Sequence, residues 1–171
     1  MGRDLPEHPT LFAKYAEALI GPHDDIQLAP ESSAVDWEAE LAVVIGATVR
    51  RASEDEAAAA VAGFTVMNDV TMRDWQFRTK EWLQGKTFEG TTPLGPVLVT
   101  PDELPGGVRP ALPISCRVDG AVMQRADTSD LVFSPVDLVR CRGPGGLADR
   151  PRRPAARAGA LVVNPNGQGR H

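Results

Sequence analysis

Three acidic residues spaced two apart are the first feature of this sequence that could do chemistry. Asp36, Glu38 and Glu40 alternate with apolar residues in the stretch VDWEAELAVVIG (35–46). Residues two apart on a strand share a face, so the three carboxylates would lie side by side. A hard divalent cation, which prefers carboxylate oxygens, would relieve their mutual repulsion. A polar strand edge that discourages aggregation is the alternative explanation for this stretch alone.

A second group of polar residues follows another expected strand. Asp69 ends the segment FTVMND (64–69), and an acid where a strand meets a loop is a usual place for a functional group. Three more polar residues follow within two helical turns: Arg73, Asp74 and Gln76. Lys86 then stands alone between a glycine and a threonine, and without further context it would be a solvated surface lysine.

These residues need strands and helices to position them. Residues 40–46 form an apolar run that predicts a buried strand. Residues 53–63 are the strongest helical segment, because Ser53 can cap the N-terminus and Glu56 completes a capping box. Gly63 is placed to end that helix.

The segment that carries the second polar group is expected to be helical. Residues 71–85 predict a helix or helical turn capped by Thr71 and ended by Gly85. Residues 86–96 are expected to be a loop, and residues 97–100 a short strand.

The last third of the chain begins with a clear hairpin pattern. Residues 112–126 alternate in polarity around Asp119-Gly120, a pair that favours a tight turn. Ser134 followed by proline then predicts the start of a helix.

Length and composition limit the classes of protein that the chain could represent. The 171 residues are 42% hydrophobic and 24% charged, as expected for one globular domain with a real core. No apolar run approaches the roughly 20 residues needed to span a bilayer, so no membrane partner is expected. A net charge of -5 disfavours a general nucleic-acid binder. Cys116 and Cys141 lack a framework spacing, which indicates reduced thiols and a cytoplasmic location.

The charge is distributed unevenly along the chain. Residues 140–171 contain seven arginines and one acidic residue, and are otherwise rich in glycine, proline and alanine. Such a composition is typical of a disordered basic tail. Only residues 160–163, Ala-Leu-Val-Val, resemble a strand.

The motifs above occur together in one known family. The segments PTLFAKYAEALIGPHDDI, VDWEAELAVVIG, AGFTVMNDVTMRDWQ, GKTFEGTTPLGPVLVT and QRADT have the order and spacing of the fumarylacetoacetate hydrolase family. The chain resembles the C-terminal catalytic domain of that family from about residue 5 to 139. The resemblance implies an α+β, mostly β fold, a mixed β-sandwich roll, and usually a homodimer. We therefore expect an incomplete catalytic domain over 1–139 and a separate tail over 140–171.

The resemblance also implies a metal site and its chemistry. In the family, the positions of Glu38, Glu40 and Asp69 bind Mg²⁺ or Mn²⁺. Lys86 matches the active-site lysine, which holds a substrate carboxylate or enolate oxygen. Gln76 matches a glutamine that orients water or substrate.

Other matching positions surround the substrate or support the metal ligands. Arg73 and Asp74 match residues that support the metal site, and Arg73 also borders the substrate position. Thr128 matches a threonine near the substrate. Lys14 matches a lysine that follows a Leu-Phe pair.

The reaction that the resemblance implies is metal-assisted chemistry on a small keto acid or 1,3-diketo acid. Cleavage of a carbon–carbon bond in an acylpyruvate or fumarylacetoacetate, through a metal-stabilised enolate, is the first expectation. Isomerases, hydratases and decarboxylases of aromatic catabolism share the same enolate chemistry and remain alternatives. A catalytically inactive metal-binding relative or a gene fragment is a third.

The chain departs from the family pattern at both ends. Hydrolytic members carry a His-x-x-Glu pair that activates water, but residues 11 and 26, three after His8 and His23, are leucine and isoleucine. Both histidines are expected to be exposed in loops. Residues 140–171 lack the family's Thr-Gly-Thr-Pro loop, so we expect either a frameshift in the coding DNA or a genuine basic tail.

Overall fold

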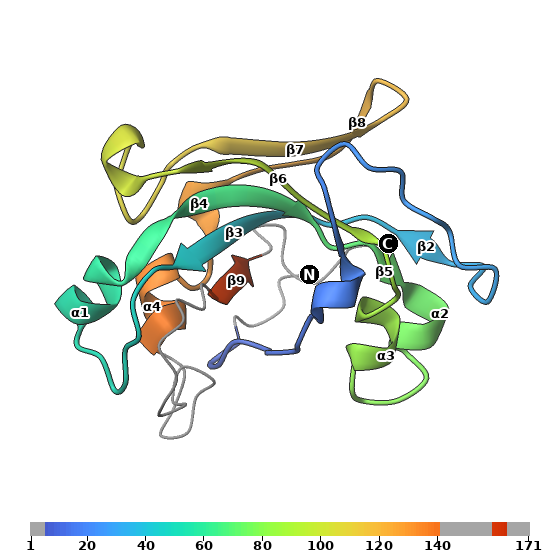
Figure 1. Cartoon of the computed structure of the whole chain (residues 1–171), viewed down its shortest axis with the longest axis horizontal. Helices are drawn as coiled ribbons and strands as arrows, with labels where there is room; N and C mark the ends of the chain where they lie inside the picture. The colour runs from blue at the N-terminus through green and yellow to red at the C-terminus, as the bar shows by residue number, and fades with distance from the viewer. Residues whose placement is uncertain (1–5, 141–158, 164–171) are drawn as a thin grey trace.

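One mixed five-stranded sheet organises the chain (Figure 1). The computed structural model describes residues 6–140 and 159–163. The strand order is β1-β6-β4-β3-β9; β1 runs parallel to β6, and the other neighbours are antiparallel. The strands are β1 (Leu19–Ile20), β3 (Ala39–Ile45), β4 (Val61–Asn68), β6 (Thr92–Val99) and β9 (Gly159–Val163).

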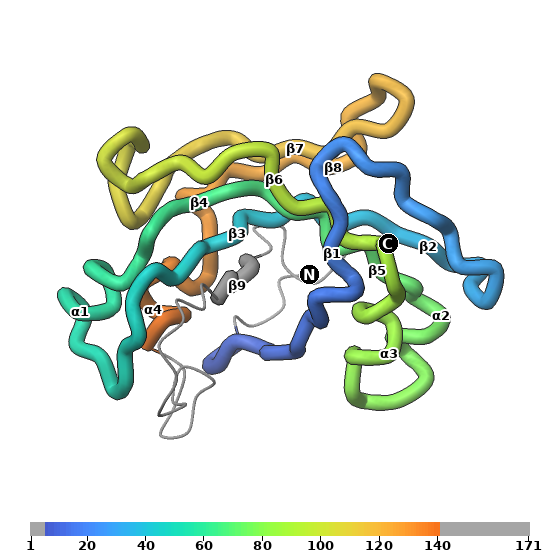
Figure 2. Tube along the Cα trace, in the orientation of Figure 1, coloured from blue at the N-terminus to red at the C-terminus, as the bar shows by residue number. Residues whose placement is uncertain are grey.

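Two strand pairs flank this sheet. The first joins β2 (Val35–Asp36) to β5 (Thr71–Met72). The second is the hairpin of β7 (Pro113–Val118) and β8 (Ala121–Asp127), which lies across the outer side of β6 and β4 in Figure 2. Asp119 and Gly120 have φ angles of 50° and 81°. Two successive positive φ values are what a tight hairpin turn requires, so the predicted hairpin is confirmed.

The helices are short. They are α1 (Glu54–Ala59), α2 (Arg73–Gln76), α3 (Leu83–Lys86) and α4 (Pro135–Arg140). Single 3₁₀ turns occur at Ala16–Ala18, Pro101–Glu103 and Thr128–Asp130. A mostly β fold with few helices and a mixed sheet confirms the fold class expected from the sequence.

The hydrophobic core lies where α1 and α4 pack against β3 and β4, at the left of Figure 1. Both helices are capped by serines, as the sequence predicts. Ser53 and Glu56 form the capping box of α1, and Ser134 accepts a hydrogen bond from the Asp137 amide of α4. The core side chains are Leu41, Val43, Ala57, Val61, Phe64, Val136, Leu138 and Val139.

The predicted end of the first helix is wrong. Helix α1 ends at Ala59, and Gly63 lies within β4. Pairing of β4 with β3 takes residues 61–63 into the sheet. A Cβ atom at Gly63 would lie 2.6 Å from the Val99 carbonyl oxygen, so the glycine permits the close approach of β6.

The helix expected over 71–85 is also wrong in extent. Thr71 belongs to β5 and donates a hydrogen bond to the Asp69 carbonyl (2.9 Å) instead of capping a helix. Two single helical turns, α2 and α3, replace the long helix. Pairing of β5 with β2 keeps the chain extended up to Met72, so no helix begins before Arg73. Gly85 lies inside α3, where a Cβ atom would meet the Gln76 amide nitrogen at 2.5 Å.

The loop expected over 86–96 is shorter than predicted. Lys86 ends α3, and β6 already begins at Thr92. Pairing of β6 with both β1 and β4 holds residues 92–96 in the sheet.

Part of the predicted tail lies within the sheet. Strand β9 contains the four residues that resembled a strand and pairs antiparallel with β3 from Leu41 to Ile45. Residues 141–158 and 164–171, with Cys141 and the remainder of the expected tail or frameshift, lie outside the described residues. Cys116 is a free, half-buried thiol. No helix in the described ranges is long and apolar enough to cross a membrane.

Candidate metal centre

Three carboxylates meet where β3 begins and β4 ends. Ala39 pairs with Asn68 in this antiparallel ladder, so Glu38 and Glu40 come beside Asp69. One oxygen from each of the three acids lies within 4.8 Å of the others. Their exposed fractions are 6%, 5% and 0%. The polar-edge alternative does not fit these residues, because Glu38 and Glu40 are buried and Glu40 pairs with Met67 of β4.

Lys86 enters this cluster from α3. Its Nζ lies 2.9 Å from Glu38 Oε1 and 2.8 Å from Asp69 Oδ2, and its side chain is almost fully buried. The ring of Phe12 covers the ammonium at 5.0 Å from its centroid. Lys86 is therefore no solvated surface lysine, and its ammonium group lies between two of the three acids.

Lys14 reaches the same acids from the N-terminal segment. Its Nζ lies 2.6 Å from Asp69 Oδ1 and donates hydrogen bonds to the Lys86 carbonyl and Thr92 Oγ1, both at 2.7 Å. An ammonium group has three N–H donors, so these partners use all of them. Lys14 thus links the N-terminal segment to α3, β6 and Asp69.

Arg73 supports the cluster from α2. Its Nη1 lies 2.7 Å from Glu38 Oε1, and its Nε donates to Asp36 Oδ2 at 2.8 Å. Gln76 is buried, and its Oε1 accepts from Arg73 Nη1 at 2.7 Å. Asp74 instead accepts a hydrogen bond from Ser32 on the surface side of α2.

Thr128 is not drawn into this network. Its hydroxyl is buried, donates to the Pro110 carbonyl at 2.6 Å and accepts from the Leu112 amide at 2.9 Å. These bonds fix the chain at the start of the hairpin. His8 and His23 are exposed, as the sequence predicts.

The electrostatics distinguish the three acids. Burial, followed by the nearby charges of Asp69 and Glu38, raises the pKa of Glu40 well above its ordinary value. Burial alone would raise the pKa of Glu38 too, but the Lys86 ammonium and the Arg73 guanidinium outweigh it, and the pKa lies below its ordinary value. Burial lowers the pKa of Lys14, although Asp69 partly offsets this.

This donor set suits a hard divalent cation. All three candidate ligands are carboxylates, which Mg²⁺ and Mn²⁺ prefer over nitrogen or sulfur ligands. Among the described residues, Glu40 forms no ion pair, although its side chain is almost fully buried, with 5% exposed. A buried carboxylate is costly unless an opposite charge compensates it or it takes up a proton, so a bound cation would compensate the charge that Glu40 carries when it is ionised.

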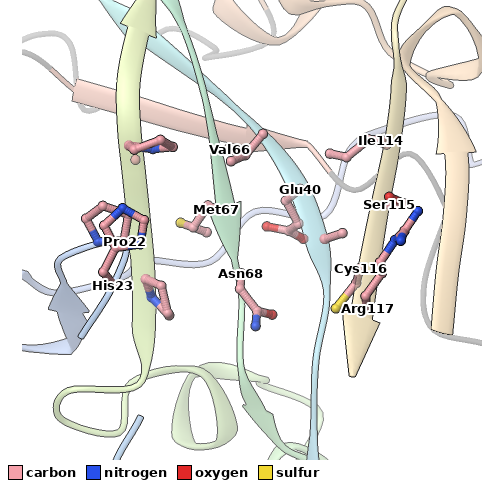
Figure 3. A pocket seen from close by; sticks show the side chains of 14 residues that line it. Pro22, His23, Glu40, Val66, Met67, Asn68, Ile114, Ser115, Cys116 and Arg117 are labelled. Atoms are coloured by element: carbon pink, nitrogen blue, oxygen red, sulfur yellow. The ribbon is translucent and has the colours of Figure 1, made fainter. Parts of the chain in front are cut away.

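A cavity of about 380 Å³ borders the cluster. It lies between β7 and the strands β6, β4 and β3, and Figure 3 shows Glu40 among the labelled side chains between Met67 and Cys116. The apolar part of its lining includes Pro22, Val66 and Ile114. One of the three carboxylates thus faces a space that a small molecule could fill.

The sequence did not single out several residues that shape the site. Asn68 and Gln124 hydrogen-bond to the backbone on either side of Glu38, and Phe12 covers Lys86. Asn68 directly precedes Asp69, which was the one available signal. Gln124 begins the QRADT segment that matches the family, but its hydrogen bonds depend on how the hairpin docks, so the segment did not indicate its role.

Comparisons with known proteins agree with the resemblance seen in the sequence. A model of the family described as fumarylacetoacetate (FAA) hydrolase C-terminal matches residues 1–142. The mitochondrial oxaloacetate tautomerase Fahd2a of Rattus norvegicus is 47% identical over 136 residues, covering 79% of this chain and 43% of that protein. The chain thus spans less than half the length of this curated relative.

Solved structures share the fold. A fumarylacetoacetate hydrolase from Exiguobacterium antarcticum has a TM-score of 0.74 at 31% identity, covering 82% of this chain and 51% of that one. A 5-carboxymethyl-2-hydroxymuconate delta-isomerase from Mycobacterium smegmatis has a TM-score of 0.71 at 36% identity, covering 82% and 54%. A family match over most of the chain and this shared architecture lead to one conclusion: the chain belongs to the fumarylacetoacetate hydrolase family.

Proposed function

We propose that this chain carries the metal centre of an enzyme that converts a small keto acid through its enolate. The observation that carries the proposal is the buried cluster of three carboxylates within 4.8 Å, with the Lys86 ammonium 2.8–2.9 Å from two of them. Glu38, Glu40 and Asp69 would hold Mg²⁺ or Mn²⁺. A bound divalent ion would supply Lewis-acid polarisation of a substrate carbonyl.

The cationic side chains have separate roles in this proposal. The Lys86 ammonium would donate a hydrogen bond to the substrate oxygen on which negative charge develops. Such a hydrogen bond stabilises the charge most strongly in a site that excludes water. Arg73 holds Glu38 in place, and Gln76 in turn orients Arg73. Lys14 and Thr128 were expected near the substrate, and for both residues a contact with substrate stays a proposal. Lys14 pairs with Asp69, and the Thr128 hydroxyl bonds to backbone groups.

We favour tautomerisation or isomerisation over hydrolytic carbon–carbon cleavage. The rat relative is named an oxaloacetate tautomerase, and the structural neighbour from Mycobacterium smegmatis is named an isomerase. Hydrolysis of an acylpyruvate is the second candidate, because another structural neighbour is named a fumarylacetoacetate hydrolase.

A direct assay separates these reactions. The purified chain is given enol oxaloacetate, and separately an acylpyruvate, with Mn²⁺ and then with a chelator, and loss of ultraviolet absorbance is followed. We expect Mn²⁺-dependent ketonisation of oxaloacetate that the Lys86→Met variant loses. Acylpyruvate cleavage without ketonisation would favour the second candidate, and equal rates with and without Mn²⁺ would contradict the proposal.

Assembly and location stay proposals. A homodimer is supported by the apolar side chains that β4, β6 and β8 expose, which include Val66, Val97, Leu98 and Val122. Sedimentation velocity would show a monomer if this is wrong. A cytoplasmic location is proposed from the sequence alone, whereas the rat relative is named as mitochondrial. No nucleic-acid or membrane partner is proposed.

A further inference from the structure

The backbone that carries Glu38 is not held by an ordinary strand ladder. Strand β2 ends at Asp36 and β3 begins at Ala39, so residues 37 and 38 fall between two strands. Backbone amide and carbonyl groups that are partly buried need hydrogen-bond partners. Here the partners are largely side-chain carboxamides.

Gln124 of β8 bonds to both sides of this interruption. Its Oε1 accepts a hydrogen bond from the Ala39 amide at 2.8 Å, and its Nε2 donates to the Trp37 carbonyl at 3.2 Å. One carboxamide therefore presents the same acceptor and donor that a neighbouring strand would present. The reverse orientation would place N–H against N–H, so the two bonds fix the orientation of the group.

Asn68 and Asp69 hold the backbone of Glu38 itself. The Glu38 amide donates to Asn68 Oδ1 at 3.1 Å, and the Asp69 amide donates to the Glu38 carbonyl at 2.9 Å. Together with Gln124, these bonds leave little freedom in the backbone of Glu38, which is itself a candidate metal ligand. We call Asn68 and Gln124 the carboxamide clamp.

We infer that Gln124 is a positioning residue that sets the affinity of the metal centre through the backbone of Glu38. This inference rests on the proposed function, since it needs a metal to be bound. The direction of a carboxylate depends on the backbone that bears it, and metal–ligand distances tolerate only small errors. Outer partners that orient ligands typically change metal affinity about 10–100-fold when removed.

The clamp also links the hairpin to the candidate metal centre. Gln124 pairs with Cys116 across the hairpin, and β7 lines the cavity that Glu40 borders. The same residue therefore ties the wall of the cavity to the strand that carries two of the acids. A shift of the hairpin would move both together.

The test is Mn²⁺ binding, measured as free Mn²⁺ by electron paramagnetic resonance. Gln124→Met keeps the length of the side chain and removes both hydrogen bonds. We expect its dissociation constant for Mn²⁺ to rise about tenfold or more. Gln27 is exposed, so Gln27→Met is the matched control and should stay within about twofold of the parent.

The outcomes separate the clamp from the metal site. If the parent chain itself does not bind Mn²⁺, the proposed metal centre is wrong and the clamp has no function. If the parent binds Mn²⁺ and folded Gln124→Met binds it equally tightly, the clamp alone is overturned. If Gln124→Met does not melt cooperatively, Gln124→Asn is the variant to measure. Its shorter carboxamide cannot bridge Trp37 and Ala39, so it should also weaken Mn²⁺ binding, and unchanged binding would overturn the clamp.

Discussion

The two halves of β3 are held in different ways. From Leu41 to Ile45 the strand pairs with β4 on one side and β9 on the other, and Leu41 and Val43 pack into the apolar core. At the other end, Glu38, just before the strand, pairs with the Lys86 ammonium and the Arg73 guanidinium, Glu40 is buried beside it, and carboxamides hold the backbone. The core half depends on the burial and close packing of apolar side chains, whereas the acidic half depends on each charged partner being present.

Loss of Asp69 should be the largest single effect in the acidic half. Its two oxygens pair with Lys14 and Lys86, so Asp69→Ala removes the carboxylate that pairs with Lys14 and leaves Lys86 with Glu38 alone. We expect the free energy of unfolding to fall by about 3–5 kcal/mol. Urea denaturation measures this, and exposed Asp25→Ala is the control; a loss below about 1 kcal/mol, typical of surface pairs, would contradict the ion-pair account.

Leu41→Ala tests the core half of the same strand. It removes a buried side chain from the cluster around α1 and α4 and should cost about 2–5 kcal/mol in urea denaturation. The Mn²⁺ affinity of the folded variant should match that of the parent. A large loss of affinity would show that the two halves are not independent.

The pH dependence of metal binding should reveal Glu40. The pKa of Glu40 is raised in the folded chain. Above pH 4.5, its ordinary pKa, the unfolded chain has therefore released the Glu40 proton while the folded chain still retains it. This proton must leave for Glu40 to bind a cation, so Mn²⁺ affinity should rise by up to about tenfold per pH unit until pH passes the folded pKa. Without metal, the contribution of Glu40 to stability should fall over the same range.

Glu40→Gln is the control for that behaviour. The amide cannot ionise, so the part of the pH dependence that comes from residue 40 should vanish in both metal binding and thermal melts. An unchanged pH profile in Glu40→Gln would assign the proton to another group.

The smallest effect is expected at the cap of α1. Ser53→Ala removes the hydrogen bond to the Glu56 amide and should cost about 1 kcal/mol. Helix α1 packs on the core half, so Mn²⁺ affinity should not change. A thermal melt combined with a Mn²⁺ titration checks both statements, and a changed affinity would link the cap to the metal centre.

Local patterns predicted much of the fold. The β3 run, the capping box and the Asp119-Gly120 turn each depend on neighbours in sequence, and all three are present. Gly63 and Gly85 were misassigned as helix ends because each is required by a close contact with a distant segment, β6 for one and α2 for the other. Tertiary packing requires glycine at these two positions, and the neighbouring sequence does not indicate that packing.

The candidate site likewise contains residues that the sequence predicted and residues whose place depends on tertiary packing. The spacing of Glu38 and Glu40, and Asp69 at a strand end, already indicated a cluster, and the structure brings the three together. The burial of Lys86 and the carboxamide of Gln124 beside Ala39 depend on how separate segments dock. Thr128, matched by resemblance, bonds instead to Pro110 and Leu112, which only the fold of the hairpin could reveal.

Mn²⁺ titration of the parent chain and of Glu38→Ala tests the central claim most directly. Glu38 is a proposed ligand, so its loss should weaken Mn²⁺ binding by more than the roughly 10–100-fold that an outer partner costs. Exposed Glu103→Ala should bind Mn²⁺ as the parent does. If Glu38→Ala binds Mn²⁺ as tightly as the parent, the three carboxylates are not the metal centre of this protein.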